Sequence, residues 1–325
     1  MIRIKRGLDL PISGAPVQAI VTSASTRTVA LLGRDYVGMK PTVVVTEGER
    51  VKLGQVLFTD KKCPLINFTS PGAGTVAAIN RGSQRRLLSV VIELDGDEQV
   101  GFSRYDPIEL DKLSRQSVVD DLLKSGLWTA LRTRPYSKVP NPETTPHSLF
   151  VNLMDSNPLA ADPALILAAR HDDLIAGINL LATLPQHQLY VCSNPDTAAD
   201  IAPQRLAGNV EIQQFRGPHP AGLAGTHIHM LQPAGAHKEV WTINYQDVIA
   251  IGKLFATGEL DTERVISLAG PQVLEPRLLR SRLGANLDEM VAGELKPQES
   301  RVISGSVLGG TKAAGVEAYL GRYHQ

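Results

Sequence analysis

The first hundred residues carry short apolar runs that are closed by glycine. The runs "TVVVTEGERVKLGQVLFTD", "SPGAGTVAAINRG" and "LLSVVIEL" set valine, isoleucine and leucine beside Gly48, Gly54, Gly72 and Gly74. β-branched residues between turn-forming glycines are typical of short strands joined by tight turns. The pattern predicts a small β-domain, which we place at residues 1–103.

The hydrophobic period changes after residue 104. The stretch "SVVDDLLKSG" repeats apolar residues at helical spacing, and "SLFVNLM" is a strand-like run. A helix in "ADPALILAARHDDLIAGINLL" has Asp162 as its N-cap and Pro163 at its first position, and the apolar runs "QLYVCS" and "VEIQQF" follow it. Strands alternating with helices predict a parallel sheet with crossover helices. We place this Rossmann-like α/β domain at residues 104–257.

The last region follows a predicted helix in "NYQDVIAIGKLFATGEL", which Asn244 can cap and Gly258 can end. Beyond it, "RVISLAG", "RLLRSRLGANLDEMVAG" and "ESRVISGSVLGG" alternate strand-like runs with one helix. We expect a compact α+β module at residues 258–325. The two changes of period therefore predict three domains in an α/β multidomain chain.

The charge balance restricts the partners. The chain has 33 basic and 33 acidic residues and a formal net charge of zero, which argues against a nucleic-acid binder. No window approaches eighteen uncharged apolar residues, and the N-terminus has no apolar run of the signal-peptide type, so we expect neither a membrane span nor export. Cys63 and Cys192 lie far apart, without the spacing of a thiolate zinc or iron–sulfur site.

A histidine-rich stretch, "HPAGLAGTHIHML", contains His219, His227 and His229, and His237 is nearby. A strand would place His227 and His229 on one face, where they could begin a metal site if further ligands were present. Because no Asp, Glu or Cys is interleaved with them, we favour a pair of partly exposed histidines on a strand edge over a metal site.

The phrases EGxxVxxGQxL and SPxxGxV, within residues 35–95, resemble the β barrel-sandwich hybrid fold of biotinyl and lipoyl domains. Such domains display one lysine at a hairpin tip, and Lys61 and Lys62 lie between the two phrases. The lysines are either a swinging arm or part of a solvated loop. We favour the loop, because the segment is longer than a tight hairpin and carries Cys63 and Pro64 where a strand should restart.

A β-hybrid, a Rossmann-like domain and a soluble-ligand-binding β-grasp module, in this order, resemble the A-subunit family of the bacterial sodium-translocating NADH:quinone oxidoreductase. The phrases that carry the resemblance are "GPHPAGLAGTHIHMLQP", "VWTINYQDVIAIGKLFATGEL", "RVISLAGPQVLEPRLLRSRLGA" and "ESRVISGSVLGG". The C-type component of the Rnf complex and the flavin-bearing subunit of respiratory complex I are more distantly similar. Members of the A-subunit family continue past a "GRYHQ"-like phrase, so we expect a chain truncated at its C-terminus.

The resemblance implies a peripheral subunit on the cytoplasmic face of the bacterial inner membrane, bound to integral-membrane and other subunits of the complex. The enzyme is then the whole translocase, an NADH:ubiquinone reductase that transports Na+, and the isolated chain is not catalytic. Its expected roles are assembly and a contribution to ubiquinone binding. Two alternatives stay open: a free-standing flavin or NAD(P) oxidoreductase, and a carrier or binding module that uses Lys61 or Lys62.

Three phrases depart from the pattern of the flavin-bearing relatives. Their GxxGxGGAGFPT loop, whose glycines admit the FMN phosphate, corresponds here to "GLWTALRTRP" at residues 126–135, which keeps one glycine and ends in a proline without an N–H. Their NAxExEP reads "NLMDSNP", with Asn157 in place of a carboxylate, and their YPxGAE reads "HPAGLA", with Ala224 in place of the glutamate. We therefore expect no FMN, NADH or iron–sulfur site in this chain.

A quinone head group makes simpler demands: a flat apolar slot and one or two hydrogen-bond donors. The loop "LWTALRTRPYSK" and the stretch "LLGRDYVGM" supply both kinds of group. The candidate residues are Trp128 and Leu131 as walls, Arg134, Tyr136 and Lys138 as donors, and Leu32, Tyr36 and Met39 as a second wall. We expect both segments to face one crevice between the first and second domains. The alternative is that the loop packs against a neighbouring domain or another protein of the complex.

Overall fold

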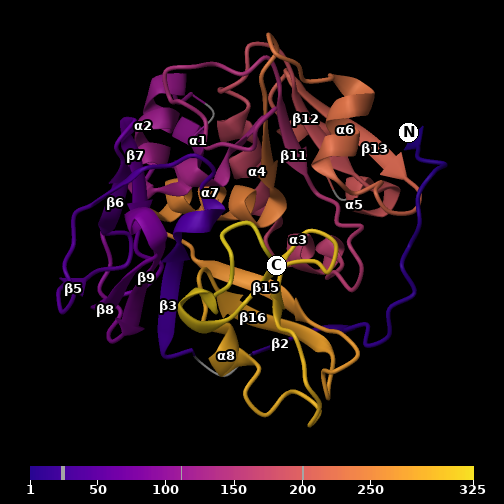
Figure 1. Ribbon diagram of the computed structural model, residues 1–325. Coiled ribbons are helices and arrows are strands. Elements are labelled where there is room, and N and C mark those ends of the chain that lie inside the picture. Colours follow the sequence, from indigo (N-terminus) through magenta and orange to yellow (C-terminus); the bar gives the residue numbers. More distant parts are fainter. Residues whose placement is uncertain (23–25, 111, 200) are drawn as a thin grey trace. The chain divides into compact units, whose positions relative to one another are not determined.

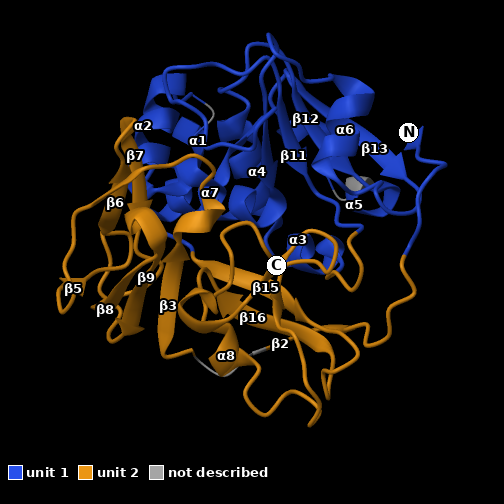
Figure 2. Cartoon of the chain, in the orientation of Figure 1, with its two compact units in different colours: residues 1–9, 101–156, 162–261 blue, residues 10–100, 157–161, 262–325 orange. Residues whose placement is uncertain are grey.

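The computed structural model describes residues 1–22, 26–110, 112–199 and 201–325. Contacts group them into two compact units (Figure 2). Unit 1 holds residues 1–9, 101–156 and 162–261, and unit 2 holds residues 10–100, 157–161 and 262–325. The chain passes between the units close to both expected boundaries, at 103 and 257, but its first and last regions share one unit. The division into three domains stays a prediction.

Unit 1 is built on a mostly parallel sheet (Figure 1). Its strand order is β1-β13-β12-β11-β14-β10. The strands are β1 (Ile2–Arg3), β10 (Arg132–Arg134), β11 (Leu149–Asn152), β12 (Leu189–Ser193), β13 (Val210–Arg216) and β14 (Val240–Asn244). Only β10 runs antiparallel to its neighbour, β14, and every other pair in this sheet is parallel. The parallel sheet predicted from the sequence is confirmed.

The helices of unit 1 begin and end at the residue types expected for them. Its helices are α1 (Pro107–Leu110), α2 (Arg115–Ser125), α3 (Pro163–Ala169), α4 (His171–Leu181), α5 (Pro195–Ala199), α6 (Ala224–Leu231) and α7 (Tyr245–Thr257), with 3₁₀ turns η3 (Leu127–Ala130) and η4 (Pro203–Arg205). The Asp162 side chain accepts from the N–H of Ala164, and Asn244 caps α7, which ends at Gly258 in the left-handed conformation. These caps are confirmed. The helix predicted after Asp162 is divided at Arg170 into α3 and α4.

One face of this sheet packs against α6. In a buried cluster, Ile228 of α6 packs against strand residues whose side chains face the same side of the sheet, together with Met154. These strand residues are Phe150, Tyr190, Cys192, Phe215 and Val240. Ile2 and Ile4 of the N-terminal segment pack against the same cluster. Burial raises the pKa of the Cys192 thiol, as is typical of an inert core cysteine.

Two other helices, α4 and α7, meet backbone to backbone. A Cβ added at Gly177 of α4 would lie 2.1 Å from the carbonyl oxygen of Val248 in α7. A Cβ added at Gly252 of α7 would lie 1.8 Å from the carbonyl oxygen of Asp173 in α4. Each helix therefore needs a glycine where the other crosses it.

Unit 2 combines β-strands from both ends of the chain. Its strands are β2 (Val17–Thr22), β3 (Thr28–Leu32), β4 (Pro41–Val43), β5 (Arg50–Val51), β6 (Val56–Asp60), β7 (Cys63–Thr69), β8 (Gly74–Arg81), β9 (Leu87–Leu94), β15 (Glu263–Leu268), β16 (Arg277–Arg282), β17 (Ile303–Ser304) and β18 (Thr311–Lys312). It also contains α8 (Leu287–Met290) and the 3₁₀ turns η1 (Gly33–Asp35), η2 (Ser83–Arg85) and η5 (Gly315–Glu317).

The sheets of unit 2 explain why its ends belong together. Two of them, β3-β9-β8-β5 and β4-β6-β7, use only the first region of the chain. A third, β15-β16-β2, places the early strand β2 parallel to the late strand β16. Thus the first and last regions share a sheet as well as a unit. Within the described residues, no helix of either unit is long and apolar enough to cross a membrane.

We expect Gly177→Ala and Gly252→Ala each to lower the free energy of unfolding by about 2 kcal/mol or more, because the new methyl group meets a carbonyl oxygen that cannot move alone. Alanine's better helix propensity, worth about 1 kcal/mol, is too small to offset this. Gly225→Ala in α6 is the control, since a Cβ there meets nothing within 4 Å. Urea unfolding checks the prediction, which fails if all three variants are as stable as the parent.

Candidate functional site

The predicted quinone loop begins as a part of the unit 1 core. Gly126, with φ of 79°, ends α2 in the left-handed conformation, and the next four residues form η3. Trp128 is fully buried, its Nε1 donates to the carbonyl oxygen of Pro140 at 2.9 Å, and its ring meets Trp241 edge to face at 5.4 Å. Leu131 is fully buried as well. The side chains predicted as slot walls are thus core side chains.

The loop continues as β10 and a closed turn. The N–H of Thr133 donates to the carbonyl oxygen of Lys138 at 2.8 Å, and the N–H of Ser137 donates back to Thr133 at 3.0 Å. Tyr136 and Ser137 have φ of 84° and 52°, which is uncommon for residues other than glycine. We call residues 134–138 the Tyr136 turn.

The Tyr136 turn presents its ring and its cations together. Tyr136 is 71% exposed, and Lys138 Nζ lies 5.7 Å from the centre of its ring, within cation–π range. Arg134 is half-buried and donates to the Ser137 hydroxyl. Burial, together with the charge of Arg132, lowers the pKa of Arg134. The three predicted donors therefore form one cluster.

The second predicted wall lies in unit 2 and is largely internal. Leu32 is buried in a cluster with Ala30, Val91 and Tyr319. Tyr36 is buried, and the centre of its ring lies 4.6 Å from the centre of the Phe68 ring. Met39 is half-buried. The first residue of η1, Gly33, serves the fold, since a Cβ there would lie 2.3 Å from the carbonyl oxygen of Leu87. Quinone contact at the eight candidate residues stays a prediction.

The carboxyl edge of the parallel sheet brings two of the singled-out phrases together. Asn152, at the end of β11, donates from Nδ2 to the carbonyl oxygen of Gly222 at 2.9 Å. The N–H of Gly222 donates to Ser156 Oγ at 2.8 Å. His219 lies beside Ser156, and its own N–H donates to Asp9 Oδ1 at 2.8 Å. The parts played by Ser156 and Asp9 were not predicted, since nothing in their local sequence links them to residue 219.

This serine and histidine are not arranged for nucleophilic catalysis. Nδ1 of His219 lies 2.8 Å from the carbonyl oxygen of Ser156, which can only accept, so this nitrogen carries a proton. It therefore cannot take the proton of Ser156 Oγ, 3.1 Å away. Asp9 bonds the backbone of His219 rather than its ring. The cluster holds the two loops in place.

The expected histidine pair on a strand is wrong. His227 and His229 lie on α6, where two positions turn the side chain through about 200°, so they point to different sides. His227 is buried and His229 is exposed. The helical spacing of Leu223, His227, Ile228 and Leu231 was the overlooked signal.

Among the described residues, no three His, Cys, Asp or Glu side chains gather as metal ligands would. His227 instead makes an internal contact. Its Nε2 donates to the carbonyl oxygen of Ala221 at 2.8 Å, and the centre of its ring lies 4.3 Å from the centre of the Phe215 ring. Burial lowers the pKa of His227 to about 4, and the bond to Ala221 opposes that shift.

The expectation of a long loop at the lysines is also wrong. Strand β6 pairs up to Asp60 and β7 starts at Cys63, so Lys61 and Lys62 form a two-residue tip. Pro64 is tolerated because the register shifts here and β7 bulges away from β6.

The two tip lysines differ in their surroundings. Lys62 Nζ donates to the carbonyl oxygen of Gly38 at 2.7 Å, whereas the Lys61 side chain makes no hydrogen bond or ion pair with the described residues. Both lysines are exposed. The preference for a solvated loop over a swinging arm stays a prediction, but the length of the segment no longer supports it.

His227 makes stability depend on pH. Its side chain binds a proton near pH 6.5 when unfolded but only near pH 4 when folded, so the unfolded state binds more protons between these values. Stability from this residue is complete above about pH 6.5 and falls by about 2 kcal/mol on acidification to about pH 5.

We expect His227→Gln to lose less stability than the parent chain between neutral pH and about pH 5, whatever its starting stability. His229→Gln, on the exposed side of α6, should lose as much as the parent. Urea unfolding at the two pH values measures this. Equal losses in all three proteins would contradict a buried neutral histidine.

Comparison with known proteins assigns the chain to a family. Three family models match it: the NqrA N-terminal barrel-sandwich hybrid domain at residues 2–95, the NqrA second alpha/beta domain at 113–260, and the NQRA C-terminal domain at 265–315. The predicted barrel-sandwich hybrid is thereby confirmed. A crystal structure of an NAD+-reducing [NiFe]-hydrogenase in the H2-reduced state is 15% identical, with a TM-score of 0.42, over 68% of this chain and 49% of that one.

Curated relatives match along the entire chain. The A subunit of the Na(+)-translocating NADH-quinone reductase of Pseudomonas aeruginosa is 60% identical over 324 residues, which are 100% of this chain and 72% of the relative. The protein of the same name from Saccharophagus degradans is 55% identical over 324 residues, with the same coverage. The chain belongs to the NqrA family, the A subunits of the Na(+)-translocating NADH-quinone reductase.

Proposed function

We propose that this chain works as the A subunit of a Na+-translocating NADH:quinone reductase, a peripheral subunit without a redox centre of its own. The observation that carries the proposal is the 60% identity that extends over 324 residues. In this role it binds integral-membrane and other subunits of the complex at the cytoplasmic face of the bacterial inner membrane. It contributes to assembly and to a contact with ubiquinone.

The proposal includes a Rossmann-like fold for unit 1 and a β-grasp fold for the last region. For unit 1 the support is the parallel order β13-β12-β11-β14, in which the chain moves outward from β11 to β13 and then returns to the other side of β11. Such a reversal creates the edge at which open α/β sheets bind ligands. For the last region, the support is the family model matched at residues 265–315.

The absence of flavin chemistry is proposed from the sites that flavin-bearing relatives use. At the expected phosphate loop, η3 is closed by the buried rings of Trp128 and Trp241 rather than opened by glycines. At the carboxyl edge, the amide of Asn152 and the hydroxyl of Ser156 are already bonded to Gly222. Electron transfer then belongs to other subunits.

The quinone contact is proposed chiefly at the Tyr136 turn. Its exposed ring offers a flat apolar face, and Arg134 and Lys138 offer donors for a carbonyl oxygen. A positive φ at a tyrosine costs about 1 kcal/mol or more and persists only where surrounding bonds hold it. The bonds between Thr133 and Lys138 do so, and exposed backbone strain of this kind is frequent at ligand contacts.

Two properties test the proposed function together: the association of the chain with the other subunits, and the colour of the purified chain. Co-expressed with the other reductase subunits, the tagged chain is expected to retain them through affinity purification. The chain purified alone is expected to be colourless and inactive towards NADH. Retained subunits are the decisive result. A yellow chain with one FMN per molecule that binds none of those subunits would instead establish the free-standing oxidoreductase.

Quinone binding has a local fluorescent reporter, because both tryptophans of the chain, Trp128 and Trp241, pack together beside β10. A short-chain ubiquinone is expected to quench their emission saturably, with weaker binding in Tyr136→Ala and Arg134→Ala. Tyr136→Phe keeps the ring and tests stacking without the hydroxyl. Arg104→Ala, at an exposed position of the same unit, is the charge control.

Unsaturable quenching would remove this site from consideration. Identical binding by Tyr136→Ala, Arg134→Ala and the parent would do the same, and the Tyr136 turn would then be assigned to an interface with another protein of the complex.

A further inference from the structure

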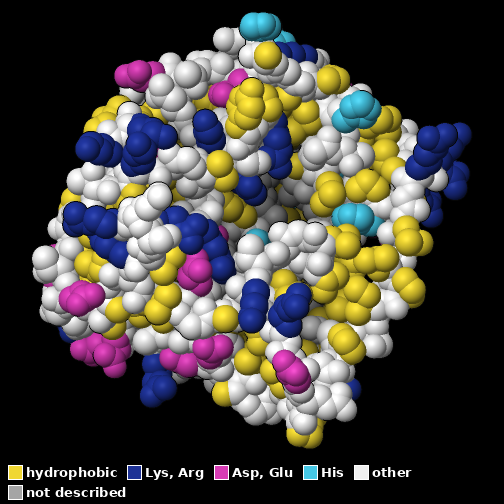
Figure 3. All heavy atoms as spheres, viewed as in Figure 1, with side chains coloured by type: hydrophobic (Ala, Val, Ile, Leu, Met, Phe, Trp, Pro, Cys, Tyr) yellow, Lys and Arg dark blue, Asp and Glu magenta, His cyan; other side chains and the backbone are white. Residues whose placement is uncertain are grey.

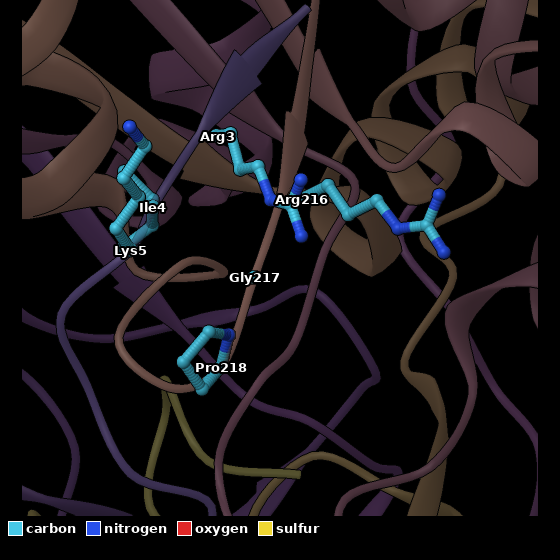
Figure 4. A pocket seen from close by; sticks show the side chains of 6 residues that line it. All are labelled: Arg3, Ile4, Lys5, Arg216, Gly217 and Pro218. Carbon is cyan, nitrogen blue, oxygen red and sulfur yellow. The ribbon is translucent and has the colours of Figure 1, made fainter.

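A cavity of about 390 Å³ lies beside the edge strand β1 of the unit 1 sheet, at the carboxyl ends of β1 and β13 (Figure 4). It is lined by Arg3, Ile4, Lys5, Arg216, Gly217 and Pro218. The lining comes from two segments far apart in the sequence, the N-terminal strand β1 and the end of β13. The volume lies in the range of sites for small molecules.

The strand register places two arginines side by side at this cavity. β1 and β13 run parallel with Ile2 opposite Phe215 and Arg3 opposite Arg216. Because Phe215 belongs to the buried cluster and Ile2 packs against it, alternation turns both arginines to the other side of the sheet. Figure 4 shows the Arg3 side chain reaching the base of the Arg216 side chain, which continues away from Arg3, while the Lys5 side chain extends to the opposite side. Like charges on facing positions of neighbouring strands repel each other.

Among the described residues, no acidic side chain forms an ion pair with these charges. Lys5 adds a third cation to the lining, and all three basic side chains are exposed. In the described parts of the chain, none of the three takes part in an ion pair or a side-chain hydrogen bond. Lysine and arginine side chains also gather on the surface at the edge where Figure 1 marks the N-terminus (Figure 3). The cluster is a local excess in a chain whose net charge is zero.

The backbone holds the two arginines in place. The N–H of Ile4 donates to the carbonyl oxygen of Arg216 at 2.8 Å. A Cβ added at Gly217, whose φ is 143°, would lie 2.2 Å from the carbonyl oxygen of Ile4. Glycine is therefore required for the two segments to lie this close. The positive charges are built into the fold rather than carried by a free tail.

We propose that this cavity binds a phosphate group on a small organic ligand or a lipid headgroup. Two guanidinium groups and one ammonium match the charge of a phosphate, and arginine forms paired hydrogen bonds with its oxygens. Ile4 and Pro218 give the remainder of the ligand an apolar wall. A bound phosphate also offsets the repulsion between Arg3 and Arg216.

The test uses the full chain with two probes. Glycerol 3-phosphate, titrated by calorimetry with inorganic phosphate alongside, represents a free organic phosphate. Vesicles of phosphatidylglycerol in phosphatidylcholine, followed by co-sedimentation, represent a headgroup. Saturable binding to either probe that weakens by about tenfold or more in Arg216→Gln and Arg3→Gln supports the site, since each arginine makes charge-assisted bonds. The probe that binds identifies the source of the phosphate.

Arg104→Gln removes one exposed positive charge of the same unit outside the cavity and is expected to bind like the parent. Thermal unfolding controls for folding, because loss of one of two repelling charges should not lower stability. The bound probe should raise the melting temperature of the parent but not that of Arg216→Gln. The proposal is overturned if neither probe binds saturably, or if Arg216→Gln and Arg104→Gln bind equally well.

Discussion

The crossing of α4 and α7 is the contact on which the architecture of unit 1 depends. Gly177 and Gly252 let each helix touch a carbonyl oxygen of the other, leaving no room for even one methyl group. α4 lies in the connection from β11 to β12, and α7 follows β14 directly. Their crossing therefore connects the segments that lead to and from the two strands flanking β11, which are β12 and β14. With β14 held there, Trp241 meets Trp128 and orders the start of the loop that presents Tyr136.

The sequence predicted those features that depend on neighbouring residues. The caps at Asp162 and Asn244 and the parallel sheet follow from short patterns, and each is found as expected. The prediction of a strand at His227 and His229 was wrong because it relied on an alternation over very few residues. The helical spacing of the apolar residues around them was the better guide. The prediction of a long loop at Lys61 was wrong because a bulge accommodates Pro64 within the strand. A bulge depends on the partner strand, which the local sequence does not identify.

Features that rely on distant residues could not be predicted. The pairing of β2 with β16 joins segments separated by most of the chain, and so does the bond from His219 to Asp9. The candidate site shows the same limit. Composition indicated an aromatic and basic loop, but only the fold separates its buried part, Trp128 and Leu131, from its exposed part at Tyr136.

The long-range strand pairs also constrain the order in which the chain can fold during synthesis. The strands β3 to β9 pair with one another within the first region, so these sheets can form soon after Leu94 leaves the ribosome, and only an isolated bridge from Val29 of β3 to Ala285 must wait for the last region. The two strands that precede them must wait: β1 for β13, and β2 for β16. The segment that holds β1 and β2 is thus translated before its partner strands and paired late. Its basic residues and its open strand edge remain accessible to other molecules throughout that interval.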